Sequence, residues 1–147
     1  MTTIHASAVL VGARAVLIRG PSGSGKSSLA YALIGAAASG ALPFARLVGD
    51  DRVHIEAAHG RALVRPAETL SGLIEIRGLG IRRLPYEAVA QIGLVVDLAA
   101  ADAARLPAAE SAVTELAGVV LPRLAVAPGI DPSPIVIAAL RTEDSGS

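Results

Sequence analysis

The sequence predicts an α/β fold, a P-loop nucleotide-binding domain with a mixed, hairpin-rich central sheet and one principal helix after the loop. Residues 20–27 read Gly-Pro-Ser-Gly-Ser-Gly-Lys-Ser, which completes the pattern G-x-x-x-x-G-K-[ST]. An apolar run over residues 15–18 precedes this loop and a helix-like run over 28–34 follows it, as in a strand–loop–helix unit that binds phosphate. Sequence patterns typical of β-hairpins are common elsewhere in the chain. A doubly wound sheet would alternate strand and helix regularly, so these patterns favour the mixed sheet.

Short extended segments dominate the predicted elements. A tight turn at Gly12 and Ala13 joins the first two strands, and a hairpin turns at His59 and Gly60. Residues 69–75 are expected to contain a short helical turn. The apolar runs predict strands over residues 7–11, 14–19, 45–49, 52–57, 61–64, 80–84, 92–98, 119–121 and 124–126.

Two helices are expected. The first runs from residue 26 to 38 and ends near Gly40, a residue type that often follows the last turn of a helix. The second is a closing helix over 134–140, with Asp131 or Ser133 as its cap.

Composition limits the classes of protein that fit. The 147 residues suggest a single domain over residues 1–141 with a frayed polar tail over 142–147. The chain has a formal net charge of zero and no cysteine. We therefore expect no nucleic-acid partner, no disulfide framework and no thiolate metal site.

Hydropathy gives no sign of a membrane protein. The mean hydropathy is +0.57, yet no stretch of about 18 apolar residues is free of charge or proline. The N-terminus lacks the basic and apolar regions of a signal peptide. We expect a cytoplasmic protein without membrane association, and the apolar composition is compatible with surfaces buried in an oligomer.

The loop chemistry predicts ATP and Mg²⁺ as cofactors. Its glycines let the backbone approach phosphate closely, so that amide N–H groups and the helix N-terminus face the anion. Lys26 reaches the β- and γ-phosphates and Ser27 offers its hydroxyl to Mg²⁺. The residues expected to bind nucleotide are Gly20, Pro21, Ser22, Gly23, Ser24, Gly25, Lys26, Ser27 and Ser28.

An acidic pair follows the strand over residues 45–49. Asp50 and Asp51 stand where a carboxylate that supports Mg²⁺ is expected, at the carboxyl end of a strand beside the loop. One could hold the metal directly or through water, and the other could accept a proton from an attacking hydroxyl. The alternative is a polar strand end with two solvated aspartates.

A third cluster lies at residues 73–83. Glu75 and Arg77 are two residues apart and would face the same side of an extended backbone. The carboxylate could coordinate Mg²⁺ and the guanidinium could neutralise phosphate charge. A surface ion pair explains the same spacing. Gly78 and Gly80 would make this loop mobile, or would let another group approach its backbone closely.

Three stretches together resemble the catalytic domain of the HPr kinase/phosphorylase family. They are residues 5–27 with the glycine loop, residues 47–53 with the acidic pair, and residues 74–81, which read Ile-Glu-Ile-Arg-Gly-Leu-Gly-Ile. Their order and spacing match as well. The resemblance implies an ATP- and Mg²⁺-dependent kinase of a serine on HPr, the phosphocarrier of the sugar phosphotransferase system. Many members also remove that phosphate with inorganic phosphate.

The resemblance also implies roles for single residues. Lys26 would contact the phosphates, and Ser27 and Glu75 would ligate Mg²⁺. Asp51 would accept the proton of the substrate serine, with Asp50 supporting it or the metal. The remaining implied catalytic residues are His5, Arg77 and, in a looser alignment, Arg105. By resemblance, residues 74–83 would serve both directions of the reaction. Separately from the resemblance, we expect residues 77–83 to be the docking and closing element.

Several departures from the family pattern modify this expectation. Ser28 stands where members usually carry an acid, and residues 126–130 lack the basic residues of the phosphorylase loop. The matching stretch begins at residue 5, and we therefore expect a truncated form without the usual N-terminal domain, the catalytic domain alone. We expect kinase activity, doubt the phosphorylase activity, and by family analogy expect a homo-oligomer, a hexamer.

Two other functions fit the same loop. One is a different P-loop enzyme that phosphorylates a small molecule, although no arginine-rich lid insertion is evident. The other is a nucleotide-binding regulatory module with phosphotransferase-system partners but without turnover.

Overall fold

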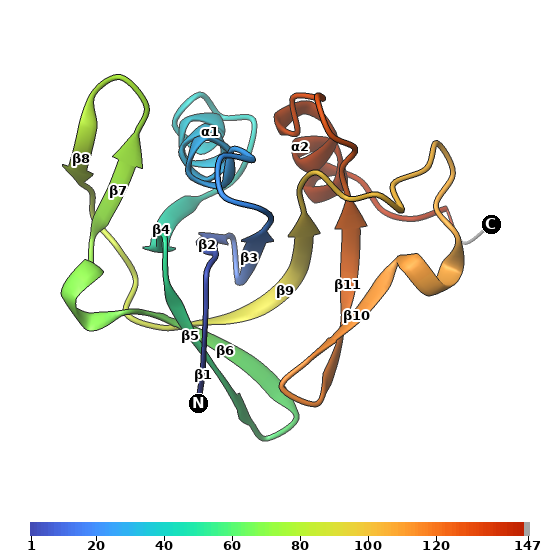
Figure 1. Ribbon diagram of the computed structural model, residues 1–147, viewed down its shortest axis with the longest axis horizontal. Coiled ribbons are helices and arrows are strands. Elements are labelled where there is room, and N and C mark those ends of the chain that lie inside the picture. The colour runs from blue at the N-terminus through green and yellow to red at the C-terminus, as the bar shows by residue number, and fades with distance from the viewer. Residues whose placement is uncertain (146–147) are drawn as a thin grey trace.

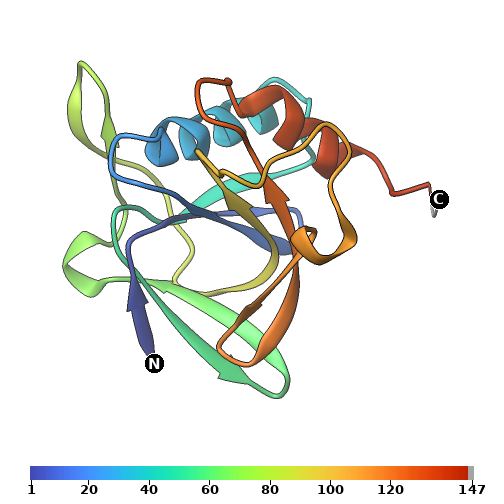
Figure 2. The same ribbon diagram turned by 45° about the vertical axis from the view of Figure 1, so that its right-hand side comes forward.

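The computed structural model describes residues 1–145 and has a mixed sheet with two helices on one face (Figures 1 and 2). The helices are α1 (Lys26–Ala38) and α2 (Ser133–Arg141). The strands are β1 (Thr2–Ile4), β2 (Ser7–Val11), β3 (Arg14–Arg19), β4 (Ala45–Gly49), β5 (Val53–Ala58), β6 (Arg61–Pro66), β7 (Leu73–Ile76), β8 (Gly80–Arg83), β9 (Ala90–Asp97), β10 (Val113–Leu116) and β11 (Val119–Ala125).

The sheet branches at β9. One edge of β9 pairs in parallel with β3, which continues through β2 to the edge strand β4. The other edge pairs antiparallel with β6 near the start of β9 and in parallel with β11 near its end. The β6 branch leads to β5 and β1, and the β11 branch to β10, whereas β7 and β8 form a separate ribbon. The mixed sheet is thus as predicted.

Strand β3 is buried on both faces because a core lies on each side of the sheet. Val16 and Ile18 belong to the cluster beneath the helices, and Ala15 and Leu17 to the cluster beneath β5 and β6. This explains the continuous apolar run before the glycine loop, since alternation is lost when both faces are covered.

The two helices pack side by side over the first cluster. Helix α1 buries Leu29, Ala30 and Leu33 and is followed by Gly40 at φ 86°, as expected of a glycine after the last turn. Helix α2 buries Val136, and the Asp131 carboxylate accepts a hydrogen bond from the Ser133 amide at 3.1 Å. No helix in residues 1–145 is long and apolar enough to cross a membrane.

Some local predictions were wrong. The expected helical turn is present as the 3₁₀ turn Glu68–Leu70, at the start of the expected range, but the strand β7 over the end of that range was not predicted. Residues 119–125 form one strand, because Pro122 precedes the residues that pair with β9 and removes no bond from that ladder. Strands β1 and β10 were not predicted. Of the expected tail, residues 142–145 are exposed and 146–147 lie outside the described residues.

An ionic cluster joins the ends of β3, β9 and β11. Asp97 accepts hydrogen bonds from Arg19 at 2.7 and 2.8 Å and from Arg123 at 2.5 Å. Arg123 also donates to Asp102 at 2.8 and 3.0 Å and to the Ser111 carbonyl at 3.0 Å. Burial alone would raise the pKa of Asp97, but the hydrogen bonds and charges of Arg19 and Arg123 outweigh it and lower that pKa.

Asp97→Asn should lower the free energy of unfolding at pH 7 by about 2 kcal/mol, because Arg19 loses its charged partner and Arg123 loses one of its two. Since the folded state has the lower Asp97 pKa, this stabilisation is complete above about pH 4 and is lost as the pH falls further. Urea titrations at several pH values measure both effects.

The matched control is Glu56→Gln, which removes the more exposed pair of Glu56 with Arg65 and should cost less than about 1 kcal/mol. Equal losses in the two variants, or an unchanged acid dependence in Asp97→Asn, would contradict the assigned role of the cluster.

Candidate active site

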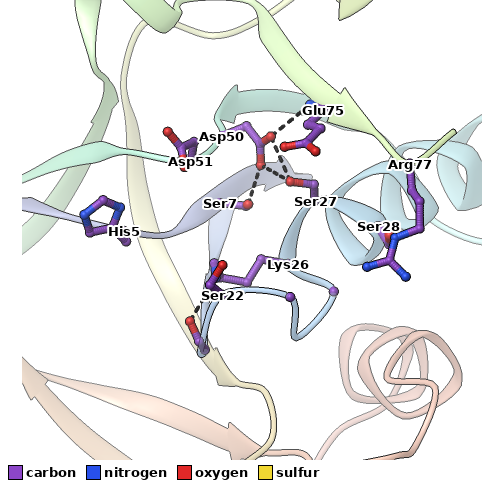
Figure 3. A pocket seen from close by; sticks show the side chains of 13 residues that line it. His5, Ser7, Ser22, Lys26, Ser27, Ser28, Asp50, Asp51, Glu75 and Arg77 are labelled. Carbon is purple, nitrogen blue, oxygen red and sulfur yellow. Dashed lines mark hydrogen bonds between the residues drawn. The ribbon is translucent and has the colours of Figure 1, made fainter. Parts of the chain in front are cut away.

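A pocket of about 730 Å³ opens where the ends of β3 and β4 meet the start of α1 and the β7–β8 ribbon (Figure 3). It collects side chains from four separate stretches of the chain. The lining residues are His5, Ser7, Gly20, Ser22, Gly23, Gly25, Lys26, Ser27, Ser28, Asp50, Asp51, Glu75 and Arg77. Most of the predicted site residues therefore lie around one cavity, whereas Pro21, Ser24 and Arg105 are not among those that line it.

The glycine loop between β3 and α1 presents backbone amides. Gly23 and Gly25 have φ values of 80° and 98°, a left-handed conformation that glycine adopts without strain. Helix α1 has no side-chain cap and no acidic residue in its first turn. Its first N–H groups and the positive end of its dipole are thus available to an anion.

Gly20 allows the loop to close tightly on itself. A Cβ atom at this position would lie 2.6 Å from Ser24 Oγ and 3.1 Å from Leu98 Cβ. The Ser24 hydroxyl is buried there, and it has no hydrogen-bond partner in the part of the chain that the structure describes. Ser24 therefore packs beneath the loop, which is why it is absent from the pocket lining.

Lys26 is folded along its own loop. Its Nζ donates to the Gly20 carbonyl at 2.9 Å (Figure 3) and to the Pro21 carbonyl at 3.1 Å. An ammonium group has three donors, so one remains for an anion in the pocket. A phosphate seated in the loop would find this cation already beside it.

Asp50 is the most connected side chain of the pocket. It is 4% exposed, and its Oδ1 accepts from the Ser7 hydroxyl at 2.5 Å. The Ser27 hydroxyl lies 2.8 Å from both carboxylate oxygens, and the Glu75 amide donates to Oδ2 at 3.1 Å. Three donors from three elements thus compensate the burial of this carboxylate.

Asp51 has the opposite environment. Its side chain is 70% exposed, and its nearest ionic partner is Arg52 at 3.9 Å. The backbone of Asp51 is left-handed, with φ 69°, and Figure 3 shows its carboxylate beside Asp50 on the side of His5, turned away from Lys26. Asp51 lines the outer wall of the pocket and keeps both oxygens accessible.

Glu75 and Arg77 enter the pocket from the ribbon. Glu75 is the third residue of β7, whereas Arg77 already belongs to the turn that leads to β8. Within the described residues no ion pair joins them, so the surface-pair alternative finds no support there. Both side chains are exposed and face the cavity.

His5 and Arg105 differ in position. His5 is exposed in the bend between β1 and β2 and borders the pocket on the side of Asp51 (Figure 3). Arg105 is exposed in the segment that follows β9 and does not border it.

Ser7 is the site residue that was not predicted. It is fully buried in β2 and bonded to Asp50. The available signal was a hydroxyl residue at the start of an apolar strand, because a buried polar group needs a partner.

The oxygen ligands of the pocket suit Mg²⁺, which prefers hydroxyl, carboxylate and phosphate oxygens. Ser27, Asp50 and Glu75 supply the first two kinds. In residues 1–145 no group of three or more His, Asp or Glu residues could hold a metal ion alone.

Several known proteins are similar to this chain. The HPr kinase/phosphorylase of Streptococcus thermophilus is 42% identical over 81 residues, which are 54% of this chain and 24% of that protein. The corresponding protein of Clostridium tetani is 38% identical over 84 residues, 57% of this chain and 25% of the other. The matched part of the chain thus spans about a quarter of the length of these relatives.

The structure of the Hpr(Ser) kinase/phosphatase from Coxiella burnetii has the same fold, with a TM-score of 0.76 and 21% identity over 96% of this chain and 95% of that one. The family model of the HPr serine kinase C-terminal domain matches residues 1–144. The predicted resemblance is therefore confirmed, and the chain belongs to the family of the HPr serine kinase C-terminal domain.

Proposed function

We propose that this domain transfers the γ-phosphoryl group of ATP, with Mg²⁺, to a serine of HPr. The observation that carries the proposal is one cavity that combines a glycine loop, an ammonium group, a set of oxygen ligands and an exposed carboxylate. Phosphoryl transfer requires little covalent chemistry from the protein, so positioning and charge neutralisation dominate. The family of the chain favours HPr as the acceptor.

The glycine loop would hold the phosphates of ATP through the first amides of α1 and through Lys26. Ser27, Glu75 and Asp50 would hold the metal. When bound, Mg²⁺ neutralises charge on the phosphate oxygens. Arg77 lines the same cavity and would add a guanidinium to the charges around the transferred group.

Asp51 would act as the base for the acceptor serine. Asp50 cannot do this, because its oxygens are buried and already accept hydrogen bonds. The exposed Asp51 side chain is free to change rotamer in roughly nanoseconds, which would aim it at a hydroxyl at the pocket mouth. His5 lies on the same side and would help to position that hydroxyl.

The forward reaction should dominate. Residues 127–130 lie between β11 and α2, have no cationic side chain and do not line the pocket, so they offer little to hold a second phosphate.

The proposals of a cytoplasmic location and of self-association rest on the family alone. A small-molecule kinase and a non-catalytic sensor are the competing proposals, and the first experiment below separates them.

Incubation of purified HPr with ATP, Mg²⁺ and this protein should produce phosphoserine, detected by mass spectrometry. Lys26→Ala should lower the rate at least about 100-fold through lost charge stabilisation. Asp51→Asn should lower it about 100-fold or more while ATP binding persists. Excess inorganic phosphate should reverse little of the product.

The control is Glu110→Gln, an exposed carboxylate outside the pocket, which should leave the rate unchanged. Near-parental activity in Asp51→Asn would exclude it as the base. ATP binding without phosphoserine would favour the sensor, and transfer to a metabolite instead of HPr would favour the small-molecule kinase.

Lys26 allows a direct test of nucleotide binding, because it is the single lysine among the 147 residues. Amine acylation followed by peptide mass spectrometry should modify Lys26 in the free protein. ATP with Mg²⁺ should slow this modification about tenfold or more, since a bound phosphate occupies the ammonium group. The N-terminal amine serves as the internal control, and equal protection of both amines would contradict a specific site.

Ser7 should act as a positioning residue through Asp50. Ser7→Ala should weaken Mg²⁺-dependent ATP binding in calorimetry about tenfold, because groups that orient metal ligands have effects of this size. Ser7→Thr, which retains the hydroxyl, should recover part of the loss.

The matched control is Ser39→Ala, at the far end of α1, where the hydroxyl donates to a carbonyl at 3.1 Å. If Ser7→Ala kept the Mg²⁺ dependence of the parent protein, Asp50 would not need the Ser7 bond.

A further inference from the structure

The β7–β8 ribbon stands out from the body of the molecule beside α1 (Figures 1 and 2). Ile74 anchors it and is buried in the cluster beneath the helices. The antiparallel register places Glu75 opposite Ile81. Directly opposed side chains share a face of the ribbon at roughly 5 Å between Cβ atoms, so Ile81 lies beside the candidate magnesium ligand.

The far part of the ribbon exposes apolar side chains. Leu79 is 59% exposed and Ile81 is 63% exposed. Isolated exposed apolar residues are common on protein surfaces. These two differ because Glu75 and Arg77 of the same ribbon line the active-site pocket. A molecule that covered Leu79 and Ile81 would therefore reach the pocket mouth.

The same ribbon carries three arginines. The guanidinium groups of Arg77, Arg82 and Arg83 make no hydrogen bond or ion pair in the described residues. Arg83 pairs with Leu73 and shares the face of Ile81, whereas Arg82 pairs with Ile74 and lies on the other face. With Glu75 as its single carboxylate, the ribbon has an excess of two positive charges, whereas the whole chain is neutral. Unpaired guanidinium groups can each form a two-pronged bond with a carboxylate of a partner.

We propose that Arg77, Leu79, Ile81 and Arg83, the ribbon patch, form the docking surface for the protein acceptor. The patch would bind a face on which apolar side chains, flanked by carboxylates, surround the acceptor serine. This inference rests on the proposed function. Interfaces enriched in arginine around a buried apolar centre are common, and continuity with the pocket assigns the patch to the acceptor rather than to a remote partner.

The test measures the binding of HPr separately from the binding of nucleotide. Ile81→Gln and Leu79→Gln should each weaken HPr binding in surface plasmon resonance about tenfold, as expected for an apolar residue at the centre of an interface. They should raise KM for HPr by a similar factor and leave ATP affinity unchanged. Arg83→Glu should weaken binding further and reduce its dependence on salt, because it reverses a charge that shares the face of Ile81 and would face carboxylates.

The matched control is Val120→Gln, which changes a side chain that is 66% exposed on β11, away from the pocket. It should alter neither HPr binding nor ATP affinity. Unchanged HPr binding in Ile81→Gln, Leu79→Gln and Arg83→Glu would overturn the docking proposal while the kinase assignment stands. If Ile81→Gln or Leu79→Gln changed the molar mass of this protein in light scattering relative to the parent, the patch would instead be assigned to contact with a second copy of the chain. Failure of the parent protein both to bind and to phosphorylate HPr would overturn the proposed function itself.

Discussion

One buried carboxylate holds the candidate site together. Asp50 receives hydrogen bonds from Ser7 of β2, from Ser27 of α1 and from the Glu75 amide of β7. These bonds join the central sheet, the helix behind the glycine loop and the projecting ribbon. A carboxylate so deeply buried is stable only when its oxygens are satisfied. The geometry of the pocket therefore depends on all three donors at once.

The branched sheet explains how distant residues reach this carboxylate. Parallel pairing of β3 with β9 extends the sheet beneath the helices, while β2 and β4 lie on the other edge of β3. The glycine loop and the acidic pair both follow strands that end at the same edge of the sheet, as ligand sites of α/β proteins generally do. The ionic cluster around Asp97 fastens the neighbouring ends of β3, β9 and β11.

Local signals made much of this predictable from sequence. The glycine loop, α1 and the β2–β3 turn each have residue types that specify their backbone, and the structure has them over the predicted ranges. Strands β1 and β10 depend instead on pairing with β5 and β11, which a short and largely exposed segment does not reveal. The role of Ser7 was missed for the same reason, because its partner lies 43 residues away.

The adjacent aspartates show how one backbone torsion separates two chemical roles. In an extended strand, consecutive side chains already point to opposite sides, and the left-handed φ of 69° at Asp51 turns the chain out of β4 at this point. Asparagine and aspartate tolerate this conformation better than other residues with a side chain. Asp50 is thereby buried among donors, whereas Asp51 faces solvent with both oxygens accessible. A metal-supporting group must stay fixed and a base must reach its substrate, so the turn supplies both from neighbouring positions.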